Sequence, residues 1–437
     1  MKFPLTLPGL ILAAIFTWTS APSAGAAPEA EIFNVRTFGA TGDGRTLDTA
    51  AIQKALDACK KSGGTVLFPP GTYLSQPLVI RSQTTLKLEQ GATLLATTNQ
   101  SDFMKEPGDW LAAKSGSAFV PFIRGKDLAD VTITGGGVID GNGAVWWGEA
   151  EKARQRVSGY TLPRPNLIVI ERSQNVRLEN ITLQNSPKFH FVPTECEGVV
   201  VSNVTILAPE RAANTDAIDP SACKNVLITH CTIDVGDDNV AIKAGKKVAG
   251  RDFASEDIIV TDCTFLHGHG MSIGSETAGG VRNVTVTRCT FANTENGIRI
   301  KSDVKRGGIV ENIRYSDITM SNVMPALTFT CYYMNNSAGD AGQPGAAAVV
   351  GGKIPVYRNI SIRNLTATCP KSAGVILGLP DTCISNVVFE NVTISARTGL
   401  TIRNAKDIQF TNSSVTVIKG PVLKAENAQV TGLNDGN

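Results

Sequence analysis

The sequence has no excess of charge of either sign and few aromatic residues. Lys and Arg number 41 against 39 Asp and Glu, and aromatic residues make up 6% of the 437 residues. A basic excess that would favour nucleic acid as a partner is therefore missing. Any attraction for an acidic ligand has to come from a local arrangement of side chains.

The spacing of the nine cysteines excludes a zinc site of the usual kind. No Cys-x-x-Cys pair and no Cys/His spacing typical of zinc occurs. Cys231, Cys263 and Cys289 recur at one position of a repeat, which predicts small buried core side chains. Cys196, Cys223, Cys331, Cys369 and Cys383 are expected in turns, and Cys369 with Cys383 is our preferred disulfide.

Residues 1–26 predict a cleaved secretory signal. Lys2 precedes an apolar run at 10–16, and small residues follow up to Ala26. A membrane anchor needs ~20 apolar residues, and Pro4, Pro8 and Pro22 interrupt this stretch. We therefore expect a secreted or periplasmic protein without membrane association after cleavage.

A pattern of short strands repeats through residues 203–302. Four passes of the pattern are Asn203–Ile206, His230–Ile233, Asp262–Phe265 and Arg288–Phe291. A second segment follows each pass, and these segments align on Ile218, Val240, Met271 and Ile298. A repeat of roughly 23–32 residues built from alternating strands predicts a solenoid. We expect one all-β domain over residues 27–437, because solenoids run long as single domains.

Residues 36–73 predict an N-terminal module that closes the solenoid. Thr46–Ser62 has the pattern of one amphipathic helix, and Gly63 and Gly64 end it. The helix is expected to cover the open apolar end of the first coil. The Gly-rich residues 39–44 lack the preceding strand and the Lys of a phosphate loop, which argues against nucleotide binding.

Two irregular stretches interrupt the coils at Asn99–Ser117 and Gly141–Asn166. They carry Trp110, Trp146, Trp147 and Tyr160. Long loops on a regular scaffold often line a binding face. Their aromatic side chains either stack on sugar rings or pack against the solenoid.

Asn-x-Thr triplets recur at one position of the repeat. They begin at Asn180, Asn203, Asn283, Asn364 and Asn391. Because asparagine suits tight turns, we interpret them as coil corners rather than glycosylation sites.

The alignment gathers polar residues on one outer wall. Asp216, Asp238, His269 and Asn296 share one slot on successive coils, which lie ~4.8 Å apart. Strand alternation directs the aligned apolar residues inward. The same alternation directs outward Asp219, Lys243, Ser272, Arg299 and Lys301. Lys243 is therefore a candidate substrate contact.

Four motifs on successive coils resemble glycoside hydrolase family 28, the polygalacturonases and related pectin-degrading enzymes. They are Asn214-Thr215-Asp216, Gly236-Asp237-Asp238, Gly268-His269-Gly270 and Arg299-Ile300-Lys301. The resemblance extends from about Thr37 to Tyr333. It implies a right-handed parallel β-helix that hydrolyses α-1,4-linked galacturonate with inversion, without a metal or other cofactor. Ala217 and Asn239 replace the Gly and Cys of many members, but neither change removes a catalytic group.

Clustered carboxylates suit glycoside cleavage, because one must donate a proton and another must activate water. Their mutual repulsion should raise one pKa and so create the acid. By resemblance, Asp237 is the acid, Asp216 and Asp238 hold and activate water, and His269 adjusts the protonation of the acid.

The resemblance also implies the substrate contacts. Arg299 and Lys301 would bind the carboxylate of the sugar at the cleaved bond, and an Arg fork matches that group. Asn214 belongs to the first motif, and Tyr332 or Tyr333 would lie beside the substrate. The expected partner is an acidic polysaccharide, pectin or polygalacturonate, and the expected oligomeric state is a monomer.

Several alternatives stay open. Residues in one slot of neighbouring coils lie nearer the separation of retaining enzymes than the ~6.5–9.5 Å of inverting ones. Exo-action is slightly favoured, and a branched pectin such as xylogalacturonan or rhamnogalacturonan is an alternative substrate. A calcium-dependent pectate lyase and a non-catalytic sugar-binding β-helix are the remaining alternatives.

Overall fold

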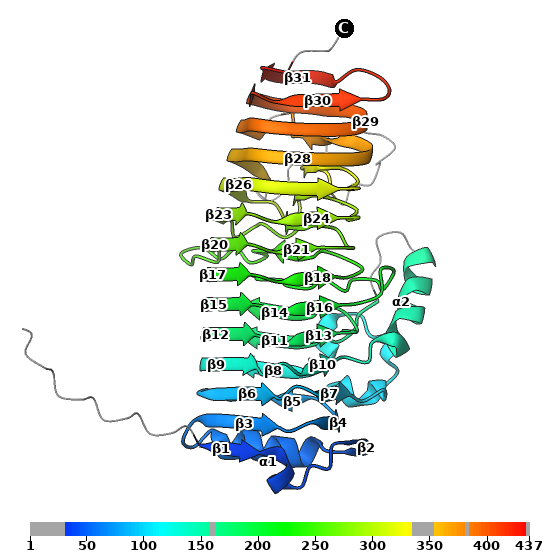
Figure 1. Cartoon of the computed structure of the whole chain (residues 1–437), viewed down its shortest axis with the longest axis vertical. Coiled ribbons are helices and arrows are strands. Elements are labelled where there is room, and N and C mark those ends of the chain that lie inside the picture. The colour runs from blue at the N-terminus through cyan, green and yellow to red at the C-terminus, as the bar shows by residue number, and fades with distance from the viewer. Residues whose placement is uncertain (1–30, 157–161, 334–353, 381–383, 434–437) are drawn as a thin grey trace, which may run out of the picture. The chain divides into compact units, whose positions relative to one another are not determined.

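The computed structural model describes residues 31–156, 162–333, 354–380 and 384–433. Residues 31–437 belong to one compact unit in which strands of successive coils pair in parallel (Figure 1). The expected signal at 1–26, Tyr160 and Cys383 lie outside the described residues. Within them, every helix is too short or too polar to cross a bilayer.

Strands at equivalent positions of the coils form walls that run along the stack. The first wall contains β1 (Ile32–Asn34), β3 (Gly64–Phe68), β6 (Thr84–Leu88), β9 (Ala129–Thr134), β12 (Gln174–Glu179), β15 (Glu197–Ser202), β17 (Lys224–Thr229), β20 (Ser255–Thr261), β23 (Val281–Thr287) and the first part of β26 (Ile309–Ser321). The second wall contains β2 (Asp43–Leu47), β4 (Gly71–Ser75), β7 (Ala92–Ala96), β10 (Val138–Asp140), β13 (Thr182–Gln184), β16 (Thr205–Leu207), β18 (Thr232–Asp234), β21 (Thr264–Phe265), β24 (Thr290–Ala292) and the end of β26.

The third wall carries the aligned segments that the sequence singled out. It contains β5 (Leu78–Val79), β8 (Ile123–Lys126), β11 (Ile168–Glu171), β14 (Phe191–Thr194), β19 (Val240–Ile242), β22 (Met271–Gly274), β25 (Ile298–Lys301) and β27 (Leu327–Thr330). Single bridges at Ile218 and Ser221 join β14 to β19. The long strands β28 (Val356–Leu377) and β29 (Ile384–Thr411) turn through all three walls, and β30 (Ser414–Val417) and β31 (Leu423–Thr431) end the stack. The expected parallel β-helix is therefore confirmed.

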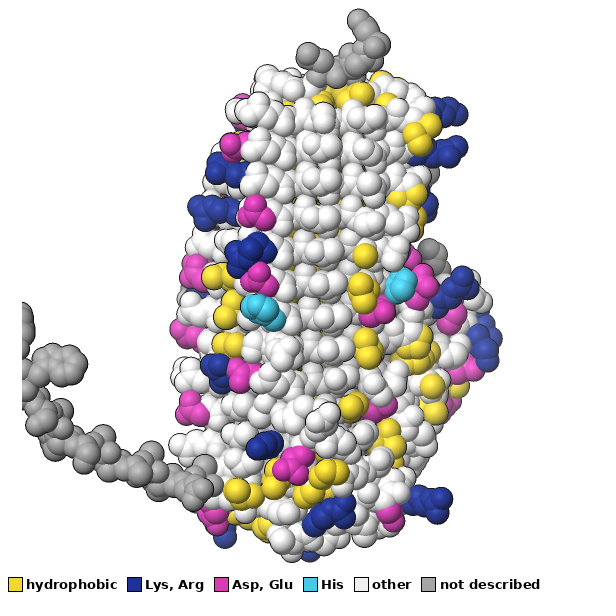
Figure 2. Space-filling view, viewed as in Figure 1, with side chains coloured by type: hydrophobic (Ala, Val, Ile, Leu, Met, Phe, Trp, Pro, Cys, Tyr) yellow, Lys and Arg dark blue, Asp and Glu magenta, His cyan; other side chains and the backbone are white. Residues whose placement is uncertain are grey.

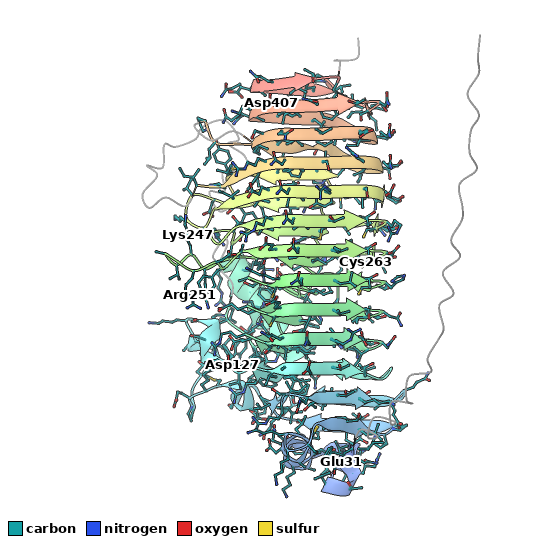
Figure 3. The ribbon with its side chains drawn as sticks, turned by 90° about the vertical axis from the view of Figure 1, so that its left-hand side faces the viewer. Glu31, Asp127, Lys247, Arg251, Cys263 and Asp407 are labelled. Atoms are coloured by element: carbon teal, nitrogen blue, oxygen red, sulfur yellow. The ribbon has the colours of Figure 1, made fainter. Side chains whose placement is uncertain are left out.

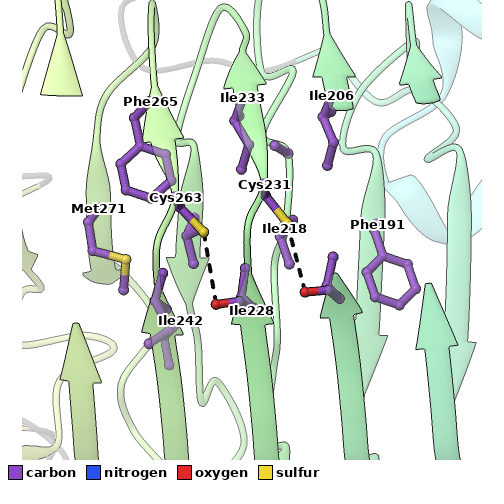
Figure 4. Close-up of a cluster of buried hydrophobic side chains, with 14 of the residues drawn as sticks. Phe191, Ile206, Ile218, Ile228, Cys231, Ile233, Ile242, Cys263, Phe265 and Met271 are labelled. Carbon is purple, nitrogen blue, oxygen red and sulfur yellow. Dashed lines mark hydrogen bonds between the residues drawn. The ribbon is translucent and has the colours of Figure 1, made fainter. Parts of the chain in front are cut away.

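The interior is filled by side chains stacked in rows. Figure 4 shows one such region, in which Ile206, Ile233 and Phe265 follow one another in a row on successive coils. Cys231 and Cys263 are 1% exposed there, and their thiols donate to backbone carbonyl oxygens of the preceding coil. The prediction of buried core cysteines is confirmed. All described cysteines are free thiols, including Cys369. The expected disulfide partner of Cys369, Cys383, lies outside the described residues.

Asparagines form ladders at the corners of the coils, as expected. Asn180, Asn203, Asn283, Asn364 and Asn391 all have left-handed backbone conformations, which asparagine tolerates better than most residues. The amide of Asn203 donates to Asn180 at 2.7 Å, and that of Asn391 donates to Asn364 at 3.1 Å. In the upper half of Figure 2, regular rows run along the stack in the middle of the visible face, with few charged or hydrophobic side chains among them. These asparagines therefore have a structural role.

The N-terminal module caps the stack. A short 3-10 helix, η1 (Val35–Phe38), precedes the helix α1 (Thr49–Cys59), which is shorter than the predicted Thr46–Ser62. Helix α1 buries Ile52, Ala55, Leu56 and Cys59 and packs against β1, β3 and β5. These apolar side chains cover the open end of the first coil, as expected.

The two stretches expected to be irregular contain short helices. Residues 99–117 contain η2 (Gln100–Phe103) and η3 (Trp110–Ala112), and η4 (Gly116–Ala118) overlaps their end. Residues 141–166 contain α2 (Ala144–Arg156), so the irregular assignment there was wrong. Alanine, glutamate, lysine and arginine, which favour helices, make up most of its second half.

The tryptophans of these stretches mainly pack against the protein. Trp146 is 1% exposed and meets Phe103, Trp110 and Phe119 edge to face. The indole N–H of Trp147 donates to the backbone oxygen of Ser186 at 3.1 Å. The packing alternative therefore holds for Trp110 and Trp146.

Shortening one side chain of the cap tests its contribution to stability. Leu56 is 1% exposed, and Leu56→Ala should destabilise the fold by about 2–5 kcal/mol through lost burial and the cavity left behind. Thermal unfolding followed by circular dichroism measures the effect. Lys54→Ala, on the exposed side of the same helix, should leave the midpoint nearly unchanged. Equal midpoints for the two variants would contradict a stabilising cap.

Candidate active site

The third wall brings the aligned residues together as the sequence alignment expects. Ile218 pairs with Val240, Val240 with Met271, and Met271 with Ile298. The residues two positions earlier therefore follow one another along the stack. In chain order they are Phe189, Asp216, Asp238, His269 and Asn296. Phe189, which the sequence analysis missed, takes this slot because Phe191 pairs with Ile218.

Asp238 is the most tightly held carboxylate of the site. Its oxygens accept from Lys301 Nζ at 2.6 Å, from Arg299 Nη1 at 3.2 Å and from Ser272 Oγ at 2.7 Å. Burial alone would raise the pKa of Asp238, but Lys301 and Arg299 outweigh burial and hold it below its usual value. Asp238 is therefore ionised and shares its charge with two cations.

Asp237 and His269 form an ion pair that faces outward. His269 Nδ1 lies 3.0 Å from Asp237 Oδ1, and His269 Nε2 lies 3.0 Å from Glu295 Oε2. Burial would raise the pKa of Asp237, but the His269 charge outweighs it and holds that pKa below its usual range. Burial would lower the pKa of His269, but Asp237 raises it to about 10. The proton of this pair therefore rests on His269.

Asp216 carries the raised pKa that the clustered carboxylates predict. Burial, reinforced by the charges of Asp219 and Asp237, raises the pKa of Asp216 well above its usual range, although Lys243 opposes the shift. Its Oδ1 is buried without a hydrogen-bond partner in the part of the chain that the structure describes. The electrostatic pattern thus differs from the expectation that Asp237 has the raised pKa, because His269 lies closer to Asp237 than any cation lies to Asp216.

Lys243 neutralises two of the buried acids. Its Nζ lies 2.5 Å from Asp219 and 3.4 Å from Asp216, and 4.3 Å from the centre of the Phe189 ring. Burial raises the pKa of Asp219 to about 6, with Lys243 opposing. Lys243 therefore holds the two acids, and its expected contact with substrate stays a prediction.

Asn214 links the site to Arg164, which the sequence analysis did not single out. Arg164 Nη2 donates at 3.0 Å to Asn214 Oδ1 and to the backbone oxygen of Ala213. The amide of Asn214 in turn lies 3.4 Å from Asp237 Oδ2. Arg164 is 2% exposed, and burial lowers its pKa to about 10. The only clue in the sequence is a charged residue among the apolar residues around 162–168.

Lys188 is a second cation that the sequence analysis missed. Its Nζ lies 4.4 Å from the centre of the Phe189 ring. Burial, followed by the positive charge of Lys243, lowers its pKa. In the described ranges the ammonium has no carboxylate within ion-pairing distance. Lys188 is thus an unpaired charge on the N-terminal side of the acids, opposite to Arg299 and Lys301 along the stack.

The structure distinguishes the two candidate tyrosines. The ring centre of Tyr333 lies 5.0 Å from Lys301 Nζ and 5.4 Å from Arg299 Cζ. Tyr332 instead donates its hydroxyl to the backbone oxygen of Gly378 at 3.2 Å. Tyr333 is therefore the tyrosine at the site.

The three side chains that could together ligate a metal ion suit this role poorly. Ligand atoms of Asp237, Asp238 and His269 lie within 4.8 Å of one another. A metal ligand must be a neutral imidazole, whereas Asp237 holds His269 in its protonated form. Both oxygens of Asp238 already accept from the cations Arg299 and Lys301. Charge compensation here comes from side chains.

Comparison with known proteins identifies the family. The model of glycosyl hydrolases family 28 matches residues 65–422. The chain belongs to this family. It is a glycoside hydrolase, and the resemblance inferred from the four motifs is confirmed.

Similar proteins include ones named for endo-action and ones named for exo-action. The chain is 35% identical over 368 residues to an endo-polygalacturonase of Pectobacterium carotovorum, covering 82% of this chain and 86% of the relative. An exopolygalacturonase of Yersinia enterocolitica superposes with a TM-score of 0.77 at 25% identity, covering 94% of this chain and 79% of the other. An exopolygalacturonase from Thermotoga maritima superposes with a TM-score of 0.69 at 27% identity, covering 92% of this chain and 93% of the other.

Removing the negative charge of Asp237 should shift the titration of His269. The stabilisation from protonated His269 is complete below pH about 6.5 and is lost as pH rises through about 10. In Asp237→Asn, the pKa of His269 should fall by at least about one unit, because its main charged partner is gone. Histidine NMR titration measures the shift. Asp262→Asn, at the corner that follows β20, should not change it, and an unchanged pKa of His269 in Asp237→Asn would contradict the ion pair.

Proposed function

We propose that this glycoside hydrolase cleaves α-1,4-galacturonosidic bonds of pectin and polygalacturonate with inversion. The observation that carries the proposal is the contact of Arg299 and Lys301 with Asp238 beside the Asp237–His269 pair. Two cations next to the acids suit a sugar that carries a carboxylate. The names of the relatives support the same substrate.

Asp237 is the proposed general acid. Its side chain is 14% exposed, against 5% for Asp216 and 2% for Asp238, so it is the most accessible of the three to a glycosidic oxygen. The proton that it needs lies on His269 Nδ1, 3.0 Å away. A bound sugar that excludes water favours the neutral pair over the ion pair, because charges lose hydration in a dry site. The proton then passes to Asp237 and onward to the leaving oxygen.

Asp238 and Asp216 are the proposed residues that hold and activate water. A substrate carboxylate competes with Asp238 for Arg299 and Lys301. As those cations turn to the sugar, the pKa of Asp238 rises and it becomes a stronger base. Tyr333, beside both cations, is placed to contact the same sugar.

Lys188 is the proposed contact on the other side of the acids. Its ammonium is unpaired among the described side chains, and Phe189 offers an apolar surface beside it. A chain that lies along the third wall would present one galacturonate carboxylate toward Arg299 and Lys301 and another toward Lys188. Two charged sugars would thus be recognised, one on each side of the cleaved bond.

Exo-action and export remain parts of the proposal. Ile218-Asp219-Pro220 with Asp237-Asp238-Asn239 is similar to bacterial exo-acting members, which slightly favours cleavage from a chain end. A branched pectin is the second candidate substrate. Because the chain is a glycoside hydrolase, a pectate lyase and a non-catalytic sugar-binding module are no longer alternative functions.

We also propose that the signal at 1–26 exports the enzyme to the periplasm or the medium.

The choice of acid is tested with a substrate that needs none. Asp237→Asn should lower kcat on polygalacturonate in excess EDTA by about 10²–10⁴-fold, as loss of a general acid does. On an aryl galacturonide with a highly acidic phenol as leaving group, the same variant should keep most of its activity, because that phenol departs without a proton. Asp216→Asn should lose activity on both substrates.

If Asp216→Asn, and not Asp237→Asn, keeps its activity on the aryl galacturonide, Asp216 rather than Asp237 is the acid.

Products separated over time show the mode of attack, since monomer or dimer from the first minutes indicates exo-action. Failure of wild type to release reducing ends from polygalacturonate would contradict the substrate assignment and point to branched pectins. Proton NMR of the newly formed anomer tests inversion.

Removing the charge of Lys188 should weaken substrate binding more than turnover. Lys188→Gln is expected to raise KM for polygalacturonate by about three- to tenfold with little change in kcat, since a single partly exposed charge contributes on the order of 1 kcal/mol. High salt should reduce the difference. Lys87→Gln, an exposed lysine of the first wall, is the matched control. Equal KM values for the two variants would exclude the contact.

A further inference from the structure

The third wall continues beyond the acids toward the last coils. The row that contains Arg299 passes through Thr328, Val375 and Thr401 to Lys424, because these residues pair in register on successive strands. At ~4.8 Å per coil, Thr401 lies roughly 14 Å and Lys424 roughly 19 Å from Arg299. A chain bound along the wall would reach this region only if it were several sugars long.

A groove of about 400 Å³ lies at the far end of this row. Val375, Thr401 and Lys424 line it together with Arg397 and Lys419. Gly399 and Gly420 also border the groove, and because glycine has no side chain they leave its edge open. The groove therefore lies on the same wall as the candidate active site and at a distance from it.

The charge of the groove is positive and uncompensated. Arg397, Lys419 and Lys424 are all exposed, and none of them forms an ion pair with a described residue. Two acidic side chains of the same coils are engaged elsewhere: Glu390 pairs with Arg363, and Glu426 with Arg403. In Figure 2, Lys and Arg side chains at the right edge of the uppermost coils stand without acidic neighbours in that view.

The groove differs from other basic surface features of the molecule. Figure 3 shows Lys247 and Arg251 on a loop that projects from the stack, where Val248 and Arg251 form an isolated antiparallel bridge. The cations of the groove instead come from strand ends and turns of adjacent coils, so they repeat along the stack. A polymer with one carboxylate per sugar presents charges that repeat in the same direction.

We propose that this groove, lined by Arg397, Lys419 and Lys424, is a distal binding site for the anionic polysaccharide chain that the active site cleaves. The inference rests on the proposed function for the identity of the ligand. Nucleic acid fits less well, because the lining residues include no aromatic side chain on which bases would stack. The groove holds long chains on the wall and leaves short oligomers unaffected.

The charge-removing variant Arg397→Gln/Lys419→Gln/Lys424→Gln tests the site. For long polygalacturonate at low salt, we expect KM to rise about three- to tenfold, since clustered charges raise the local concentration of an oppositely charged chain. For trigalacturonate, kcat and KM should stay at wild-type values. The difference on long chains should shrink at about 0.5 M salt, where charges act over only a few ångströms.

The matched control removes three positive charges at the opposite end. Arg45, Lys60 and Lys61 are exposed on the N-terminal module, and their triple glutamine variant has the same net charge as the test variant. It should bind and cleave long chains as wild type does. Equal effects of the two variants, or an equal loss on trigalacturonate, would overturn the proposal, because net charge or a general defect would then explain the result.

A measurement without turnover separates this proposal from the proposed function. Both triple variants are placed in an Asp237→Asn background, and retardation by polygalacturonate in affinity electrophoresis is compared. Weaker retardation only with the groove variant supports the site even if wild type releases no reducing ends. Cleavage of polygalacturonate by wild type together with unchanged retardation would reject the groove and leave the proposed function standing.

Discussion

The parallel register of the coils is the constraint on which the rest of this structure depends. Each coil repeats the previous one ~4.8 Å further along the stack, so residues in equivalent slots become neighbours. Ile218, Val240, Met271 and Ile298 fix this register from the inside. On the outside, the same register stacks Asp216, Asp238 and His269. One set of backbone hydrogen bonds therefore builds both the core and the chemical site.

Carboxylates stacked at this spacing repel one another, and cations on the outer wall offset that repulsion. Asp238 is neutralised by Lys301 and Arg299, and Asp237 by His269. Asp216 shares Lys243 with Asp219 and keeps a raised pKa. Asp216 therefore differs in protonation from Asp237 and Asp238, although the three lie on the same or adjacent coils. In the proposed mechanism the ionised Asp238 serves as a base, and the proton for the acid Asp237 comes from His269.

The same cations give the third wall positive charges that suit an anionic polymer. Arg299 and Lys301 lie on one side of the acids, and unpaired Lys188 lies on the other. Further along the wall, Arg397, Lys419 and Lys424 extend the positive surface without acidic partners among the described residues. The chain as a whole is nearly neutral. Its attraction for an acidic substrate is therefore local, as the balanced composition required.

The solenoid, the inward cysteines, the asparagine corners and the four motifs could be predicted from the sequence, because each is a pattern that recurs at the period of the coil. The capping helix could be predicted from its own amphipathic pattern. It did not predict α2, whose residues belong to no repeat. It also missed Lys188 and Phe189, since nothing in their local sequence marks them as functional, and Arg164, whose one clue is a charge among apolar residues. Which acid keeps a raised pKa could be learned only from the folded arrangement of the side chains. That choice depends on distances such as 3.0 Å from His269 to Asp237, which no spacing along the chain encodes.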